Sequence, residues 1–206
     1  MTTNLHPART ALVLVDTQND YFHADGALRR NGRQLSGGRS YIEKLIKLCD
    51  TGRLAGLTLV GCAFTIIADT QNAPLVPAFV KRQGITTLRG DFQAGKWGHS
   101  LIEEVKPVNY IVDKTGPSAF FRTELDIILR DRGIDTVLIA GLNSRRSAVA
   151  TAYDALSRGL RPVLVSDACT DFESPAHDLL MSALEGVFEI ETTAAVLGAL
   201  AGEVAA

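Results

Sequence analysis

The amino-acid sequence predicts an α/β protein, a three-layer α/β/α sandwich around a doubly wound, mainly parallel sheet of about six strands. Short apolar runs alternate along the chain with longer segments of helical periodicity, which is the pattern of repeated β-α-β units. The runs are apolar at consecutive positions, as expected for strands that helices cover on both faces. The 206 residues are enough for one core, and we expect a single domain over residues 1–206.

The strands are expected where branched apolar residues cluster. The first run, Ala11–Val15, ends on Asp16, and a weaker last strand is expected at Val187–Ile190. The runs between them share the length and composition of the first. They are Leu57–Thr65, Tyr110–Val112, Thr136–Ala140 and Arg161–Ser166.

Helices are expected between these strands and after the last one. The stretch Arg122–Arg132 carries leucine and isoleucine on one helical stripe, and Gly133 can adopt the left-handed backbone that ends a helix. Ser174 is placed to cap a later helix, with Pro175 at its first position. The full set is Ser40–Thr51, Pro74–Lys81, Arg122–Arg132, Ser147–Arg158, Pro175–Glu185 and Thr192–Ala201.

The overall composition argues against several classes of function. A net charge of −2, from 21 Lys and Arg against 23 Asp and Glu, gives no electrostatic reason to expect nucleic acid or an anionic membrane as a partner. The apolar runs are far shorter than the ~20 residues of a membrane-spanning helix. The N-terminus shows no secretory signal, and Cys49, Cys62 and Cys169 share no metal-type spacing. A cytoplasmic protein with reduced thiols is expected.

Polar residues follow several of the expected strands. Ligands of open α/β sheets bind beyond the carboxyl ends of the strands, which selects Asp16, Lys114, the Gly141–Ser147 turn and Asp167. A buried carboxylate suits proton transfer, a lysine can stabilise an oxyanion, and a nucleophile at a helix N-terminus gains from the helix dipole. Each residue also has an ordinary alternative role: Asp16 as a turn cap, Lys114 as a solvated surface group and Ser147 as an N-cap.

Four segments stand in a family-like order: VLVDTQNDYF, VDKTGPSAFFRTELDIILRDRGIDTVLIAG, the turn and helix that end TAYDALSRG, and PVLVSDACTD. On these segments the chain resembles the isochorismatase-like (cysteine hydrolase) superfamily, well over residues 11–20 and 108–171 and loosely elsewhere. The resemblance implies an Asp-Lys-Cys triad that hydrolyses C–N bonds. In it, Asp16 looks like the general base and acid, and Lys114 like the residue that fixes charge in the site.

The chain departs from the family pattern at the nucleophile. The family's cysteine stands seven residues after the Ala of an Ala-Gly pair, and counting from Ala140 gives Ser147. Three explanations are open: an engineered Cys→Ser replacement, a natural hydroxyl nucleophile activated by Asp16, or no covalent step at all. The last is the case in the true isochorismatases, which cleave a vinyl ether by acid catalysis. A thiol ionises far more readily than an alcohol, and we favour a Ser-for-Cys site on an amidohydrolase scaffold, natural or engineered.

The resemblance also implies the surroundings of the nucleophile. It places a cis peptide bond between Leu142 and Asn143, with the backbone N–H groups of Asn143 and Ser147 as oxyanion donors. Arg145 and Arg146 in the same turn can clamp a substrate carboxylate; alternatively they are solvated or lie between subunits. Further candidates for the substrate pocket are Asn19, Phe22 and Trp97, by family position or loop location, and Ser118 and Phe120, because they follow Lys114 closely in the chain. The aromatic residues among them have a structural alternative.

Some branches of the family bind zinc through an Asp and two His after the second strand. Residues 60–74 of this chain, VGCAFTIIADTQNAP, contain no histidine, so we expect no metal and no cofactor. Because the family commonly forms dimers and tetramers, the resemblance implies a homo-oligomer.

The leading hypothesis for function is a metal-free hydrolase of a small linear amide, ureide or carbamoyl compound. One alternative is a vinyl-ether hydrolase of the isochorismatase type, which would use Asp16 without a covalent nucleophile. The other is a catalytically silent oligomeric binding module. For either enzyme, the expected partner is a small-molecule substrate.

Overall fold

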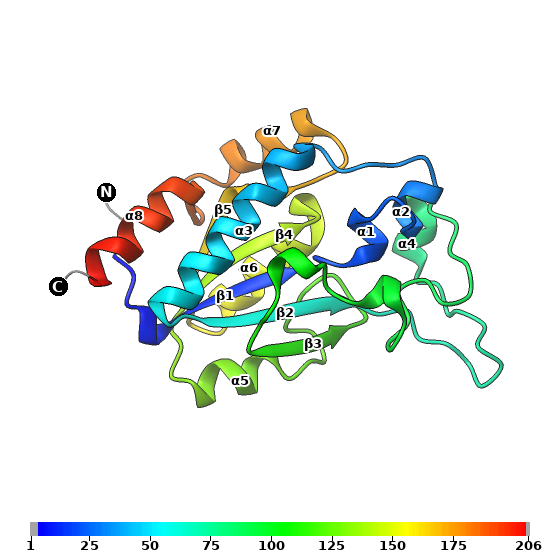
Figure 1. The fold of residues 1–206 in the computed structure, drawn as a ribbon, viewed down its shortest axis with the longest axis horizontal. Coiled ribbons are helices and arrows are strands. Elements are labelled where there is room, and N and C mark those ends of the chain that lie inside the picture. The colour runs from blue at the N-terminus through cyan, green and yellow to red at the C-terminus, as the bar shows by residue number, and fades with distance from the viewer. Residues whose placement is uncertain (1–3, 205–206) are drawn as a thin grey trace.

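The computed structural model describes residues 4–204 and contains a six-stranded sheet with helices on both faces (Figure 1). The strand order is β3-β2-β1-β4-β5-β6, and every neighbouring pair is parallel. This arrangement confirms the predicted fold class. The strands are β1 (Thr10–Val15), β2 (Thr58–Phe64), β3 (Tyr110–Lys114), β4 (Thr136–Leu142), β5 (Arg161–Thr170) and β6 (Glu189–Glu191).

The central strands are buried along almost their whole length. Every residue of β1 and β4 is buried, and so is every residue of β2 except Thr58. Their side chains alternate between two apolar clusters, with Val13 and Ile139 in one and Leu12 and Leu138 in the other. Burial on both faces explains why these strands are apolar at consecutive positions.

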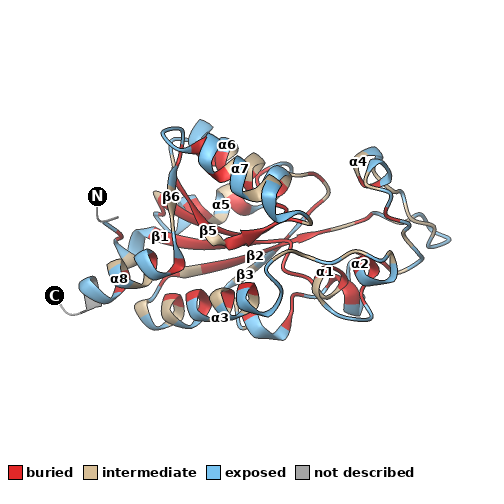
Figure 2. Ribbon diagram, turned by 90° about the horizontal axis from the view of Figure 1, so that it is seen from above, coloured by how far each residue is buried: buried red, intermediate tan, exposed pale blue. Residues whose placement is uncertain are grey.

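The helices form a layer on each side of the sheet. Their bounds are α1 (Asn19–Phe22), α2 (Ala27–Arg30), α3 (Gly38–Ala55), α4 (Ala78–Arg82), α5 (Leu125–Asp131), α6 (Val149–Ser157), α7 (Ser174–Leu184) and α8 (Thr193–Val204). Helices α5, α6 and α7 pack on one face, and α3 and α8 on the other (Figure 2). Within residues 4–204, no helix is both long enough and apolar enough to cross a membrane.

Some helix starts differ from the prediction for local reasons. Helix α4 begins at Ala78, after Pro77, which has an extended backbone (φ −61°, ψ 147°). Helix α5 begins later than predicted because the backbone of Arg122 is left-handed, with φ of 55°. Ser174, predicted as an N-cap, is instead the first residue of α7 and follows Glu173, which makes no side-chain cap. These shifts leave the order of elements unchanged.

The sheet reverses its direction of growth between β1 and β4. The chain runs from β1 to β2 and β3 on one side and then returns to place β4 on the other side of β1. Connections that leave in opposite directions open a crevice at the carboxyl ends of the two strands, where ligands of such sheets bind. Gly141 lets the strands approach at this point: a Cβ on it would lie 2.0 Å from the carbonyl oxygen of Val15, and its φ is +124°.

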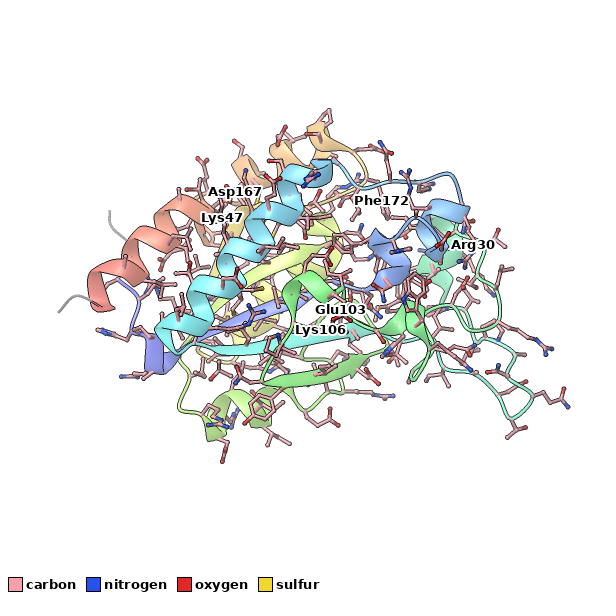
Figure 3. The ribbon with its side chains drawn as sticks, viewed as in Figure 1. Arg30, Lys47, Glu103, Lys106, Asp167 and Phe172 are labelled. Atoms are coloured by element: carbon pink, nitrogen blue, oxygen red, sulfur yellow. The ribbon has the colours of Figure 1, made fainter. Side chains whose placement is uncertain are left out.

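A large bulge in β5 moves one predicted site residue away from this crevice. Ile139 pairs with Leu164, but Gly141 pairs with Cys169, so between these pairs β5 contains three more residues than β4, while Val165 still pairs with Glu191 of β6. Asp167 lies in this bulge, accepts hydrogen bonds from the backbone N–H and the hydroxyl of Thr193 at 2.7 and 2.8 Å, and pairs with a lysine of α3. Figure 3 shows Asp167 beside α3. The prediction that Asp167 lies at the rim is therefore wrong, because the strand continues past it to Thr170.

Candidate active site

Asp16 is the first residue after β1 and lies at the crevice. Its backbone N–H donates to the carbonyl oxygen of Cys62 at 2.8 Å, which keeps it aligned with β2, and its φ is 56°. Aspartate is among the few residues other than glycine that tolerate this left-handed conformation. The residue is only 1% exposed, so its carboxyl group is almost fully removed from water.

Lys114, the last residue of β3, reaches across the end of β2 to this carboxyl group. Its Nζ donates to Oδ2 of Asp16 at 3.0 Å and to the carbonyl oxygen of Gly116 at 3.1 Å. The ammonium lies 5.6 Å from the ring centre of Phe64, at the end of β2. Because Lys114 is also 1% exposed, the two residues form a buried ion pair.

Ser147 completes the cluster from the opposite side of β1. It lies in the turn Ser144–Ala148, which joins β4 to α6, and it is 3% exposed. Its Oγ accepts a hydrogen bond from Nζ of Lys114 at 3.5 Å. The helix predicted to begin at Ser147 is regular only from Val149. The ammonium of Lys114 thus contacts both the Asp16 carboxyl group and the Ser147 hydroxyl group.

The Ser147 backbone is tied to the segment that follows β3. The hydroxyl group of Thr151 donates to the carbonyl oxygen of Ser147 at 2.7 Å and accepts from the backbone N–H of Ala119 at 3.0 Å. The same segment contains Ser118, whose Oγ accepts from the backbone N–H of Phe120 at 3.1 Å. One threonine therefore fixes the Ser147 turn against the chain that carries Lys114.

Burial raises the pKa of the Asp16 carboxyl group above its ordinary value, and Lys114, Ser147 and Arg146 oppose this shift. Oδ1 of Asp16 lies 2.9 Å from Nζ of Lys114 but receives no well-directed hydrogen bond. This oxygen therefore keeps a lone pair that can take a proton. A carboxyl group with a raised pKa and a free acceptor atom is suited to act as a general base and then as a general acid.

The peptide bond between Leu142 and Asn143 is cis. The carbonyl oxygen of Asn143 accepts from the backbone N–H groups of Arg146 and Ala148, both at 3.1 Å. Its side-chain Oδ1 accepts from Nη2 of Arg146 at 2.6 Å, whereas Nδ2 is buried and has no partner. Asn143 is thus held by the turn, and its Nδ2 remains a donor without a partner.

A cavity of about 250 Å³ opens beside this turn. We call it the arginine pocket, and its lining residues are Arg33, Gln83, Asn143, Arg145, Arg146, Asp171 and Phe172. Arg145 pairs with Asp171, with Nη2 3.1 Å from Oδ1. Figure 3 shows Phe172 farther from α8 than Asp167 is, toward the end of the molecule that carries Arg30.

Asp171 follows the true end of β5 and is 2% exposed. Burial alone would raise its pKa, but hydrogen bonds from the Arg145 guanidinium and from the backbone N–H groups of Phe172 and Arg145 outweigh it and lower the pKa. Sequence reasoning missed this residue because it ended the strand at Ser166. It stands in the PVLVSDACTD segment, where a longer strand would have brought it to the rim.

Three more residues of the pocket were missed, and all of them lie in connections between helices and strands. Arg33 follows α2, Gln83 follows α4, and Phe172 follows β5. Arg33 and Gln83 lie in long connections, which tend to be functional in compact domains, but nothing in the local pattern shows that they meet beside the same turn. Their approach to the Ser147 turn is a tertiary feature.

The aromatic candidates each have a different environment. Phe120 is 4% exposed and packs in the core under the Arg158 guanidinium, 4.7 Å from its ring centre. Phe22 stacks on Tyr41 with ring centres 5.8 Å apart, beside a separate cavity of about 300 Å³. Trp97 is 51% exposed. Within residues 4–204, the ring recorded near the Lys114 ammonium is that of Phe64 and not one of these three.

Asn19 has a clear structural contact. Its Nδ2 donates to the carbonyl oxygen of Trp97 at 2.9 Å, and its backbone N–H donates to the carbonyl oxygen of Ser100 at 2.9 Å. These bonds hold α1 against the loop that ends at residue 100. In the part of the chain that the structure describes, no three His, Cys, Asp or Glu residues gather closely enough to hold a metal ion.

Known proteins resemble this chain over nearly its full length. The model of the isochorismatase domain matches residues 10–196. The ureidoacrylate amidohydrolase RutB of Agrobacterium fabrum is 30% identical over 175 residues, which cover 80% of this chain and 77% of that protein. The protein of the same name from Variovorax paradoxus is 29% identical over 201 residues, which cover 91% of this chain and 77% of that protein.

Solved structures show the same fold. A cysteine hydrolase from Pseudomonas syringae superposes with a TM-score of 0.82, at 21% identity, over 97% of this chain and 96% of that one. N-carbamoylsarcosine amidase from Thermoplasma acidophilum gives a TM-score of 0.68 at 27% identity, over 90% and 96% of the two chains. The relatives confirm the prediction of an enzyme of the amidohydrolase class. By its domain match and its relatives, the chain belongs to the isochorismatase family.

Proposed function

We propose that this protein hydrolyses a small linear amide, ureide or carbamoyl compound, with Ser147 in the place of the nucleophilic cysteine and Asp16 and Lys114 as its partners. The observation that carries the proposal is the position of the Lys114 ammonium, 2.9 Å from the Asp16 carboxylate and 3.5 Å from the Ser147 hydroxyl. The relatives named as ureidoacrylate amidohydrolases and an N-carbamoylsarcosine amidase support a substrate with a C–N bond next to a carbonyl group.

The first step forms a covalent bond to the enzyme. Oγ of Ser147 attacks the carbonyl carbon of the substrate, and its proton passes to Asp16. Lys114 keeps Asp16 ionised before the attack, and burial favours the protonated carboxyl group after it. The two influences together let one carboxyl group accept and later release a proton.

The second step breaks the C–N bond and then frees the enzyme. The tetrahedral oxyanion accepts hydrogen bonds from the backbone N–H groups of Asn143 and Ser147. Asp16 returns its proton to the leaving nitrogen, and an ester to Ser147 remains. A water molecule, deprotonated by Asp16, then hydrolyses this ester, and the proton returns to Oγ of Ser147.

Serine in this position limits the rate. An alcohol ionises far less readily than a thiol with a pKa of ~8.5, and no histidine contacts Ser147 in the described part of the chain. We therefore expect slow turnover by the wild-type protein and faster acylation by Ser147→Cys.

The test measures ammonia release from a panel of small amides, ureides and carbamoyl amino acids. We expect Ser147→Cys to raise the rate on at least one substrate, and Asp16→Asn to abolish it. Ser157→Cys is the matched control, because Ser157 is an exposed residue at the end of α6. It introduces the same thiol outside the site, and its rates should equal those of the wild type.

Two results would point to the other functions. A Ser147→Ala variant that keeps full activity while Asp16→Asn is inactive would show acid catalysis without a covalent nucleophile. No turnover of any amide by the wild type or by Ser147→Cys would refute the amidohydrolase mechanism and leave a binding role.

A further inference from the structure

The arginine pocket carries more positive than negative charge. The guanidinium groups of Arg33, Arg145 and Arg146 line it together with one carboxylate, that of Asp171. Two other acidic groups act on these arginines: Glu173 influences Arg145, and Asp16 interacts with Arg146. Asp16 is itself paired with Lys114, so it does not neutralise the pocket.

The carboxylate of Asp171 accepts hydrogen bonds from Arg145, from the local backbone and from Ser144. Its Oδ1 accepts from Arg145 Nη2 at 3.1 Å and from the backbone N–H of Phe172 at 2.7 Å. Its Oδ2 accepts from the backbone N–H of Arg145 at 3.2 Å and from the hydroxyl group of Ser144 at 3.5 Å. Arg145 is therefore a structural residue whose charge is already balanced.

Arg33 and Arg146 are held only by neutral groups. Nη2 of Arg33 donates to the carbonyl oxygen of Gln83 at 2.7 Å, and its guanidinium lies over the ring of Phe172. Arg146 donates to the side-chain oxygen of Asn143 at 2.6 Å, and its guanidinium lies over the ring of Phe79. Among residues 4–204, neither guanidinium has a carboxylate within 4.0 Å. Two arginines fixed in one pocket without a counter-ion form a site for an anion.

Asn143 adds a donor to the same pocket. Its Oδ1 accepts from Arg146, which fixes the orientation of the amide and leaves Nδ2 as a buried donor without a partner. Asn143 is 3% exposed. A buried donor without an acceptor costs free energy, and an oxygen of a bound ligand would satisfy it.

The size and position of the pocket limit what it can hold. Its volume of about 250 Å³ is below the ~300–1,000 Å³ of sites for drug-sized ligands, so only a small molecule fits. Asn143, Arg145 and Arg146 belong to the turn that carries Ser147. Arg146 is next to Ser147 in the chain and is close enough to Asp16 to lower the pKa of its carboxyl group, so the pocket adjoins the proposed catalytic residues.

We infer that Arg33 and Arg146 bind a carboxylate group of the substrate, so that the substrates are small amides or ureides that carry a free carboxylate one short chain away from the scissile carbonyl. In this arrangement Arg145 positions the turn through Asp171, and Nδ2 of Asn143 donates to an oxygen of the bound substrate. The inference rests on the proposed function and narrows its substrate class.

The binding test uses two pairs of ligands that differ only in the carboxylate: succinamate with butyramide, and 3-ureidopropionate with propylurea. Calorimetric titration of Ser147→Ala, which cannot form the acyl-enzyme, gives affinities without turnover. We expect the carboxylated member of each pair to bind about ten- to a hundredfold more tightly, as for a hydrogen-bonded charge. Equal affinities within both pairs would overturn the inference.

The variant test separates Arg33 from the rest of the site. Arg33→Gln in the Ser147→Ala background should weaken the binding of succinamate about ten- to a hundredfold and change the affinity for butyramide less than about threefold. In an active background it should raise KM for carboxylated substrates and leave kcat nearly unchanged, because Arg33 does not contact the triad. The matched control is Arg39→Gln, which removes an exposed arginine of α3 paired with Glu43.

The outcomes distinguish this inference from the proposed function. Equal hydrolysis of neutral and carboxylated amides, unchanged by Arg33→Gln, would refute the carboxylate site and leave the hydrolase standing. Selective binding of carboxylates without hydrolysis by wild type or Ser147→Cys would refute the hydrolase and leave the anion site. If Arg33→Gln loses affinity equally for succinamate and butyramide, the role of Arg33 is merely structural.

Discussion

Replacing Lys114 by methionine tests the buried ion pair on which the site depends. Lys114 and Asp16 are each 1% exposed and their charged atoms are 2.9 Å apart. Methionine keeps most of the volume but leaves the Asp16 carboxylate buried without a counter-charge. Breaking a buried pair in this way costs about 3–5 kcal/mol. For a chain of this length, that lowers Tm by about 6–20 °C.

The effect of Lys114→Met should depend on pH. Burial raises the pKa of Asp16 and Lys114 opposes it, so the variant raises that pKa further. A folded-state pKa above the unfolded value means that the folded state holds its proton to higher pH. The contribution of Asp16 to the free energy of unfolding is then fully present below the unfolded pKa of ~3.9 and is lost as pH rises through the folded pKa. We expect the loss of unfolding free energy in Lys114→Met, relative to the wild type, to be larger at pH 8 than at pH 5.

Urea unfolding of four proteins measures this effect: wild type, Asp16→Asn, Lys114→Met and the double variant. The double variant should be more stable than the sum of the single effects, by about 2–3 kcal/mol. The matched control is Lys106→Met, which breaks an exposed pair with Glu103 (Figure 3) and should cost at most about 1 kcal/mol. Additive single effects, or a Lys114→Met cost no larger than the control, would refute the coupling.

Three further predictions follow from the same geometry. The rate of amide hydrolysis should fall as pH drops through the pKa of Asp16, because the general base must be ionised. Burial raises this pKa, and a kcat/KM profile that stays flat down to pH ~4 would contradict the role of Asp16 as the base. Asp171→Asn should cost about 1–3 kcal/mol at pH 7, since it removes a buried hydrogen-bonded charge. Because hydrogen bonds lower the pKa of Asp171, that stability is present above the unfolded pKa of ~3.9 and is lost as pH falls through the folded pKa, so urea unfolding should show the two proteins converging in acid. Gly141→Ala should destabilise the protein by at least about 3 kcal/mol or prevent folding, because its Cβ would meet the Val15 carbonyl oxygen at 2.0 Å. The control Gly159→Ala, at a residue with left-handed backbone but open space around it, should cost about 1 kcal/mol. Equal losses of stability in the two variants would show that close packing at β1 is not the cause.

The sheet and the triad were accessible from the sequence because each depends on a regular pattern. Strands buried on both faces leave continuous apolar runs, and the residues that follow them fall at one edge of a parallel sheet. The strand ends selected Asp16, Lys114 and the Gly141–Ser147 turn, and the resemblance to the family singled out Ser147 within that turn. The three side chains meet in the structure. The resemblance to the family supplied the order of the motifs but not the contacts between the side chains.

Features that depend on irregular backbone were not accessible. The bulge in β5 moved Asp167 away from the rim and brought Asp171 to it, and no periodicity marks a loop inside a strand. Arg33 and Gln83 come from long connections whose path is set by tertiary packing. Phe120 was a pocket candidate from its neighbours in the chain, whereas its burial in the core is decided by α6 above it.

Trapping of the acyl group tests most directly whether Ser147 forms a covalent intermediate. Two amides with the same acyl group and different leaving amines are hydrolysed in the presence of hydroxylamine, and the ratio of hydroxamate to free acid is measured. A shared ester on Ser147 predicts one ratio for both substrates, with neither product formed by Ser147→Ala. A ratio that changes with the leaving amine, or products that persist in Ser147→Ala, would contradict covalent catalysis by this serine.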